Sequence, residues 1–182
     1  MIEPLDQLTA RLSAAVPAAK PALEGTVLVI DRDGLVGAAT FLRDDPALKL
    51  DFLSNLCAVD WPAKNHLEVV YHLFSVALRH GPITVKCRTK DRAADAHVPS
   101  VTTIWRGAEY QEREAFDLYG VIFDGHPDLR RILMWDEMTD FPMRKDYKAP
   151  DDYEWEPTPH GDVVEKLKEL IAKRDGTQAG ST

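Results

Sequence analysis

The sequence predicts an α+β domain, in which an antiparallel sheet of three to four strands is covered by helices and followed by a long extended C-terminal arm. Stretches of helical periodicity alternate with short runs rich in β-branched residues, which indicates both kinds of element in one domain. The last three strand candidates are joined by short connections, and these favour antiparallel pairing. Beyond residue 120 the periodicity stops while aromatic residues remain frequent, a composition that argues against disorder.

The first part of the chain, residues 1–24, is expected to be a helical segment. Its apolar residues recur at helical spacing until two prolines stop the pattern: Leu5, Leu8, Leu12 and Val16, then Pro17 and Pro21. Residues 25–120 are expected to form the α+β core. The core begins with a β-branched strand at 26–30, which a turn dipeptide, Asp33-Gly34, ends.

A helix is expected next, from Leu35 to about Leu56, with a break near Pro46. Three strands follow in close succession, at 57–61, 67–76 and 83–89, and are expected to pair as an antiparallel meander. The last of these strands alternates apolar and polar residues, so one of its faces is expected to be exposed to solvent.

The helical pattern is expected to resume at residues 98–100, with Pro99 in a first turn, and to continue beyond Gly107 as a helix that ends at Gly120. Residues 121–157 are expected to form an extended docking arm, because Arg and aromatic side chains are typical of interface cores. Residues 158–182 are expected to form a short amphipathic helix and a frayed tail.

The helix before Gly120 carries charged side chains on two of its faces. Glu112 lies on the apolar face, which helical spacing assigns to Trp105, Ala108, Glu112, Ala115 or Phe116, and Tyr119. A carboxylate on this face must either pair with a cation or have a raised pKa. The candidate cations are Arg130, Arg131 and Arg144. Glu109, Arg113 and Asp117 are four residues apart and are expected to form a ladder of charges on an exposed face.

Several motifs in this region match those of one known family. Residues 112–120 read EREAFDLYG and residues 125–133 read GHPDLRRIL, while further matches are DW at 60–61, LEVVYHL at 67–73, VPSV at 98–101 and FPMRKDY at 141–147. Together these motifs closely resemble the 30 kDa subunit family of respiratory complex I, which is the C subunit of bacterial NADH:quinone oxidoreductase. The resemblance covers about residues 25–150.

The resemblance implies a non-redox structural subunit in the peripheral arm of proton-translocating NADH:quinone oxidoreductase, which passes electrons from NADH through FMN and iron–sulfur centres to quinone. No catalytic, cofactor-binding or metal-binding residue is expected on this chain, since FMN, the iron–sulfur clusters and quinone would belong to partner subunits. The expected partners are the quinone-site (49 kDa-like) subunit and adjacent iron–sulfur subunits, at the cytoplasmic face of the bacterial inner membrane. The alternative is a homologous subunit of a membrane-bound hydrogenase or of another complex I relative with a different electron donor.

The interface is expected to use the residues of the two signature motifs and the basic pair of the last one. These are Glu112, Arg113, Glu114, Asp117, Tyr119, Gly120, His126, Asp128, Arg130, Arg131, Arg144 and Lys145. Among them His126 is expected to be a hydrogen-bonded interface histidine. A stand-alone hydrolase using Glu112, His126 and Asp128 lacks an accompanying nucleophile or metal set, and an unrelated protein-interaction module is the remaining hypothesis.

Composition agrees with a non-redox role. Cys57 and Cys87 are the only cysteines, whereas an iron–sulfur cluster needs four thiolates, so this chain cannot hold one alone. Both are expected to be small, buried, unpaired residues in a reducing cytosol, because no signal peptide is recognisable. Dinucleotide, P-loop, nucleophile-elbow and zinc-protease motifs are absent. A net charge of −8 argues against binding to nucleic acid. No apolar run approaches the ~20 residues that a membrane span needs, so any association with a membrane is expected to be indirect.

Overall fold

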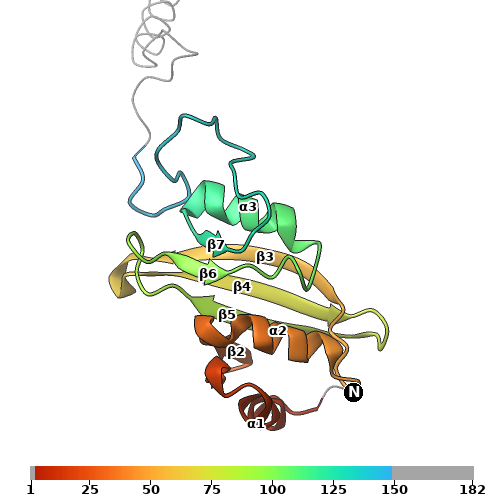
Figure 1. The fold of residues 1–182 in the computed structure, drawn as a ribbon. Coiled ribbons are helices and arrows are strands. Elements are labelled where there is room, and N and C mark those ends of the chain that lie inside the picture. The colour runs from red at the N-terminus through yellow and green to blue at the C-terminus, as the bar shows by residue number, and fades with distance from the viewer. Residues whose placement is uncertain (1–2, 149–182) are drawn as a thin grey trace, which may run out of the picture. The chain divides into compact units, whose positions relative to one another are not determined.

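The computed structural model describes residues 3–148 and confirms the α+β class. Its main sheet has five strands in the order β1-β2-β5-β4-β3 (Figure 1). Their bounds are Ala22–Glu24 for β1, Val27–Ile30 for β2, Phe52–Trp61 for β3, His66–Ser75 for β4 and His80–Arg88 for β5. Neighbouring strands pair antiparallel except β2 and β5, which pair parallel, so the predicted meander of the last three strands is confirmed.

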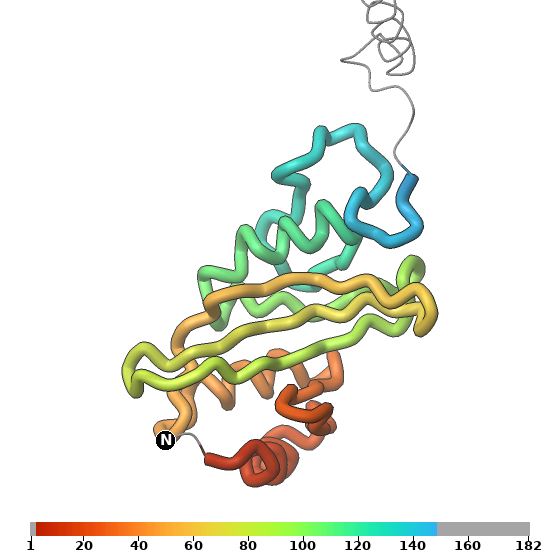
Figure 2. The backbone as a smooth tube through the Cα atoms, turned by 180° about the vertical axis from the view of Figure 1, so that it is seen from behind, coloured from red at the N-terminus to blue at the C-terminus, as the bar shows by residue number. Residues whose placement is uncertain are grey.

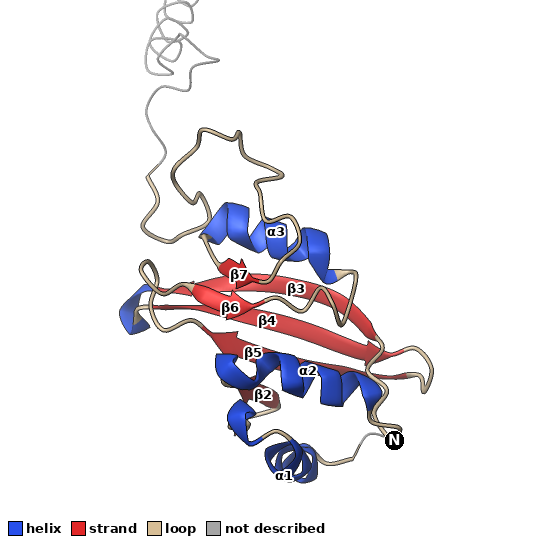
Figure 3. Cartoon of the chain, in the orientation of Figure 1, coloured by secondary structure: helices blue, strands red, loops and turns tan. Residues whose placement is uncertain are grey.

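Two helices cover one face of this sheet. Helix α1 (Leu5–Ala15) packs against helix α2 (Leu35–Asp44), and α2 packs against the strands, as the view from either side shows (Figures 2 and 3). Seen from behind, strands β3 to β5 have no helix in front of them (Figure 2). The core therefore lies between α2 and the sheet, around Leu35, Leu42, Tyr71, Leu73 and Val85. Single 3₁₀ turns occur at Pro17–Ala19, Arg32–Gly34 and Pro62–Lys64.

Helix α3 (Ala108–Tyr119) lies along β3, the strand at the edge of the sheet (Figure 1). The side-chain oxygen of Gln111 accepts a hydrogen bond from the backbone N–H of Leu56. Helix α3 therefore covers part of the outer edge of β3, where no further strand pairs with it. Two short strands, β6 (His97–Pro99) and β7 (Ile122–Asp124), flank α3 in sequence and pair parallel in a separate sheet.

Two predicted elements are wrong. The helix expected to reach Leu56 ends at Asp44, and residues 52–56 begin β3. A β-bulge between Leu53 and Asn55 inserts one residue, so two core-facing leucines, 53 and 56, stand three apart as they would on a helix. The helix expected at residues 98–100 is also absent, because His97–Pro99 forms strand β6 beside β7.

The chain divides into two units, residues 1–147 and 148–182. The predicted C-terminal helix and tail, and residues 149–157 of the predicted arm, lie outside the described residues.

The two cysteines are free, as predicted, but differ in exposure. Cys87 is buried between β2 and β4, and burial raises its pKa to about 12. Cys57 is exposed, so its predicted burial is wrong: its neighbours Leu56 and Ala58 face the core, and the alternation of the strand turns Cys57 to the opposite face.

We expect the native chain to react with a thiol reagent once, at Cys57, because this thiol is exposed whereas the thiol of Cys87 is buried. A colorimetric thiol assay measures this, with Cys57→Ser as the unreactive control and with two equivalents expected after unfolding in urea. Two equivalents in the native protein would contradict the burial of Cys87.

Candidate protein-docking surface

The predicted arm returns along α3 and is fixed to it at several points. Gly120 ends the helix with a positive φ of 75°, and its N–H donates to the carbonyl of Phe116 at 2.8 Å. A Cβ on Gly120 would lie 2.6 Å from the ring of Phe141 and 2.8 Å from Nη2 of Arg144. Only glycine therefore permits both this helix end and the close approach of the arm.

The side chain of Asp117 anchors the arm by binding backbone N–H groups of the arm. The fully buried carboxylate accepts hydrogen bonds at Oδ2 from the N–H groups of Ile132 (3.0 Å), Leu133 (2.7 Å) and Met134 (3.0 Å). Nη1 of Arg131 donates to its Oδ1 at 2.7 Å. Burial raises the pKa of Asp117, but these hydrogen bonds outweigh it and hold the pKa below its ordinary value.

Arg113 complements Asp117 from the preceding turn of the helix. Its Nε donates to the carbonyl of Arg130 at 3.1 Å, and its Nη2 donates to the carbonyl of Arg131 at 3.2 Å. Arg113 and Asp117 are both buried, so the predicted solvated ladder is wrong: the arm covers that face of the helix.

The distal part of the arm is fixed by further, partly buried contacts. Arg144 donates from Nε to the carbonyl of Tyr119 at 2.7 Å, and its guanidinium lies 4.5 Å from the centre of the Phe141 ring. The guanidinium of Arg131 lies 5.4 Å from the same ring. Two cations therefore contact the ring of Phe141.

Asp60, at the end of β3, anchors the last described residues. Its buried carboxylate pairs with Nε and Nη2 of Arg92 at 2.7 and 2.8 Å, and its Oδ2 accepts a bond from the N–H of Lys145 at 2.9 Å. Arg92 also binds Asp146 at 2.8 Å. The sequence interpretation quoted Asp60 only as part of a motif. The available signal was its inward position in the alternation of Leu56, Ala58 and Asp60.

Glu112 binds none of the three candidate arginines in the structure, and its pKa is raised, which was the second possibility. Its fully buried carboxyl group accepts from Oγ of Ser100 at 2.7 Å and from the N–H of Val101 at 2.8 Å. Burial raises its pKa to about 7. Glu112 therefore connects α3 to the turn after β6.

His126 is hydrogen-bonded, as predicted. Its Nδ1 accepts from the N–H of Asp128 at 3.0 Å, which leaves its Nε2 to donate to the carbonyl of Glu109, also at 3.0 Å. Arg130 pairs with Asp128 at 2.9 Å in solvent, and Glu114 and Lys145 are exposed. The interface role of these residues stays a prediction.

Helix α3 and the arm fixed to it hold several large apolar side chains toward solvent. We call them the arm surface, and they have exposed fractions between 36% and 64%: Tyr110, Ile132, Leu133, Trp135 and Met143. Exposed apolar side chains on a fixed loop are typical of protein-binding sites. The sequence interpretation named the charged residues instead, because they carry the recognisable motifs.

Residues 3–148 contain no group of three or more His, Cys, Asp and Glu side chains placed to hold a metal ion. Among those same residues, no helix has the length and apolar character to cross a membrane.

Residues 28–153 match the family model described as respiratory-chain NADH dehydrogenase, 30 Kd subunit. The NADH-quinone oxidoreductase C 2 subunit of Rhizobium meliloti (strain 1021) is 47% identical over 114 residues, which are 62% of this chain and 60% of that protein. The NADH-quinone oxidoreductase C subunit of Roseiflexus castenholzii (strain DSM 13941 / HLO8) is 46% identical over 142 residues, 75% of this chain and 80% of that protein. The matched region spans about three fifths of the Rhizobium relative.

Two solved structures share the fold. A chain of the membrane-bound sulfane sulfur reductase, an archaeal respiratory membrane complex, aligns with a TM-score of 0.63 and 25% identity, covering 80% of this chain and 86% of that chain. The trypsin-resistant fragment of Nqo5 aligns with a TM-score of 0.50 and 24% identity, covering 69% of this chain and 98% of that chain.

Proposed function

The chain belongs to the family of the 30 kDa subunit of respiratory-chain NADH dehydrogenase, and on that premise we propose that it is a structural subunit of proton-translocating NADH:quinone oxidoreductase. It lies in the peripheral arm of the complex and carries no redox centre or active site of its own. Electrons pass from NADH through FMN and iron–sulfur centres on partner subunits to quinone.

The observation that carries this proposal is the arm surface, where exposed apolar side chains stand on α3 and on a loop that buried charged groups hold against this helix. The fixed backbone of residues 131–134 lowers the entropy that docking would cost. A complex that transfers electrons between centres on different chains needs fixed distances between those chains. A rigid subunit that binds two or more of them supplies that geometry.

The partners in this proposal are the quinone-site (49 kDa-like) subunit and the adjacent iron–sulfur subunits. The chain then sits at the cytoplasmic face of the bacterial inner membrane and is attached to it through those partners. The interface includes the predicted signature residues, with the arm surface in direct contact. Its shape is fixed by the buried residues Arg113 and Asp117 and by the partly buried Arg131.

Affinity purification of the tagged chain from detergent-solubilised membranes tests this function. We expect the quinone-site subunit, iron–sulfur subunits and an NADH-oxidising flavoprotein subunit to be recovered together. The isolated chain is expected to contain no stoichiometric iron or flavin by metal analysis and visible absorption. Recovery of the chain without any of these subunits, or iron bound to the isolated chain, contradicts the proposal.

A second candidate function is a matching subunit in a respiratory complex with another electron donor. The similarity in fold to a chain of the sulfane sulfur reductase complex favours it. The same purification separates the two functions, because NADH reduces the chromophores of the purified complex only in the first. A complex that lacks an NADH-oxidising subunit supports the second.

A further inference from the structure

The arginines of the arm spend their charges on contacts within the chain. Arg131 pairs with the buried carboxylate of Asp117, and Arg144 donates to a backbone carbonyl at the end of α3. Arg130 is exposed, but it pairs with the exposed carboxylate of Asp128, so this pair adds no net charge. None of the three arginines therefore adds a free positive charge to the loop that runs between them.

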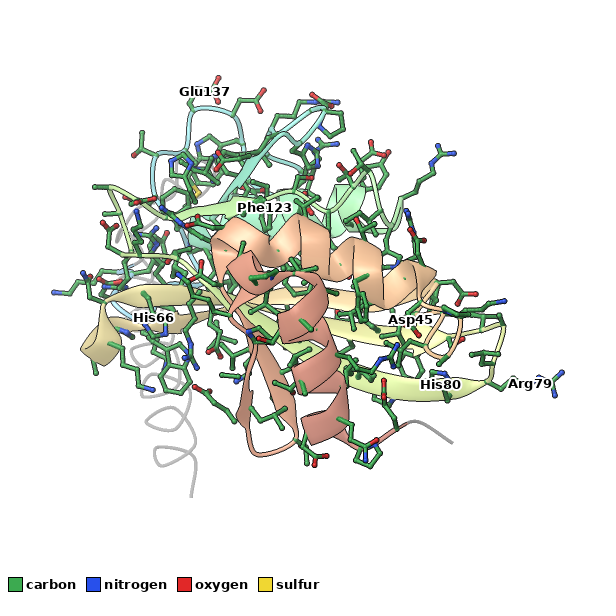
Figure 4. The ribbon with its side chains drawn as sticks, turned by 60° about the horizontal axis from the view of Figure 1, so that its bottom comes forward. Asp45, His66, Arg79, His80, Phe123 and Glu137 are labelled. Carbon is green, nitrogen blue, oxygen red and sulfur yellow. The ribbon has the colours of Figure 1, made fainter. Side chains whose placement is uncertain are left out.

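Three exposed carboxylates lie on that loop: Asp136, Glu137 and Asp140. Residues 132–143 contain no Lys or Arg. Within residues 3–148, none of the three carboxylates forms an ion pair or a hydrogen bond. Glu137 lies at the outer end of the loop and points away from the ribbon (Figure 4). The arm therefore keeps its arginines paired within the chain and presents three unpaired negative charges to solvent.

A β-turn holds two of these carboxylates in place. The N–H of Met138 donates to the carbonyl of Trp135 at 3.1 Å, so Asp136 and Glu137 are the central residues of the turn. The side chain of Met138 is buried, whereas that of Trp135 is 44% exposed. The two negative charges thus follow directly on an exposed aromatic residue of the arm surface. Groups that are fixed before docking lose less entropy when a partner binds them.

An exposed carboxylate on its own is usually only solvated. These carboxylates, however, alternate along the chain with apolar side chains of the arm surface, namely Leu133 and Trp135 before the turn and Met143 after it. A partner that buries those apolar side chains also removes water from the carboxylates between them. Charges that lose water without gaining a counter-charge weaken binding, and interfaces avoid this by charge complementarity. The arm surface therefore fits an apolar patch that is bordered by cations.

We propose that the arm surface binds a protein subunit through an apolar patch with a basic rim, and that Lys or Arg side chains of this rim pair with Asp136, Glu137 and Asp140. This inference rests on the proposed function and gives the chemistry of the partner at the same surface. The carboxylates repel an anionic lipid surface. They also disfavour a second copy of this chain, whose net charge is −8.

Competition between two forms of the chain tests the charge of the partner. A variant and the wild-type chain carry different tags and are produced together in the native cell, so their ratio in the purified complex measures their relative affinity. Glu137→Lys is expected to lower the share of the variant at least about tenfold, because it sets like charges against each other. Glu137→Gln is expected to lower it about two- to fivefold, since it removes one rim charge and keeps the shape.

Ser13→Lys/Ala14→Lys is the matched control. It changes the net charge as much as Glu137→Lys does, at two exposed positions in the last turn of α1, where cations are tolerated. The control is expected to compete as well as the wild-type chain. All variants are expected to keep the melting temperature of the isolated chain, because these side chains are exposed.

Two results of the competition overturn the basic rim. The first is equal or better competition by Glu137→Gln, because a partner without a cation binds the uncharged side chain at least as well. The second is a control that competes as poorly as Glu137→Lys, because net charge then explains the loss. In both cases the wild-type chain still enters the complex, so the proposed function stands. A wild-type chain that enters no complex contradicts the proposed function itself.

Photo-crosslinking identifies the occupant. A photoreactive amino acid replaces Thr139, which is exposed beside the carboxylates, in the full chain in native membranes. We expect a crosslink to another protein subunit of the complex. A crosslink to lipid or to a second copy of this chain, or no crosslink although the chain is in the complex, overturns the proposal.

Discussion

Replacing Asp117 with alanine is expected to release the arm from α3 and to lower the free energy of unfolding by about 3–5 kcal/mol. The change leaves Arg131 without its buried partner and leaves the N–H groups of Ile132, Leu133 and Met134 without an acceptor. The loss of the buried carboxylate thus leaves three partly buried donors without an acceptor and a partly buried cation without its counter-charge, and both defects are costly in a folded protein. The backbone that carries the arm surface loses its fixed geometry at the same time.

Urea denaturation of the isolated chain measures this loss, with Asp128→Ala as the matched control. Asp128 is also an aspartate paired with an arginine, but both partners are largely exposed, so its removal is expected to cost far less than the removal of Asp117. Equal losses in the two variants would show that Asp117 does not anchor the arm.

Stability is expected to fall as pH rises through 7 because of Glu112. Burial raises the pKa of this carboxyl group from its ordinary value of 4.5 to about 7 in the folded chain. The folded state therefore binds this proton more tightly than the unfolded state. The stabilisation is fully present below pH 4.5 and is lost as pH rises through 7, by about 3 kcal/mol in total.

Glu112→Gln removes this dependence, because the amide cannot ionise and still offers an oxygen to the N–H of Val101. The difference in unfolding free energy between variant and wild type is expected to move in favour of the variant by about 3 kcal/mol from pH 4.5 to pH 8. The difference between variant and wild type removes the contributions of the other titrating groups, because both proteins contain them. Asp117 and Asp60 are two such groups, and their lowered pKa values affect stability at low pH. Urea denaturation at several pH values measures it, and a difference that does not vary with pH contradicts the raised pKa.

The elements that could be predicted are those in which the apolar residues recur at one regular spacing from end to end. The leucines of α1, the alternation of β5 and the apolar face of α3 each follow such a period, and all three elements form as expected. The start of β3 failed because its bulge imitates helical spacing. Strands β1, β6 and β7 have three residues each, too few to show a period, and β6 and β7 form by pairing residues far apart in sequence.

The site could be predicted in its residues but not in its contacts. Helical spacing correctly placed Arg113 and Asp117 away from the apolar face, and local rules then assign such a face to solvent. The arm that covers this face returns from residues 130–134, and nothing in the period of α3 encodes that return. The same holds for Asp60 and Arg92, which are 32 residues apart in sequence.

The most direct test of the docking account is the amount of intact complex formed by Leu133→Asp. The side chain of Leu133 is more than half exposed, and its N–H still reaches Asp117 in the variant, so the fold is expected to remain. We predict a melting temperature of the isolated chain within about 2 °C of wild type and at least about tenfold less intact complex on a native gel of solubilised membranes. Val36→Asp, the exposed control on α2, is expected to assemble normally. Complex at wild-type levels with Leu133→Asp would contradict the assignment of the arm as the surface through which this subunit is held.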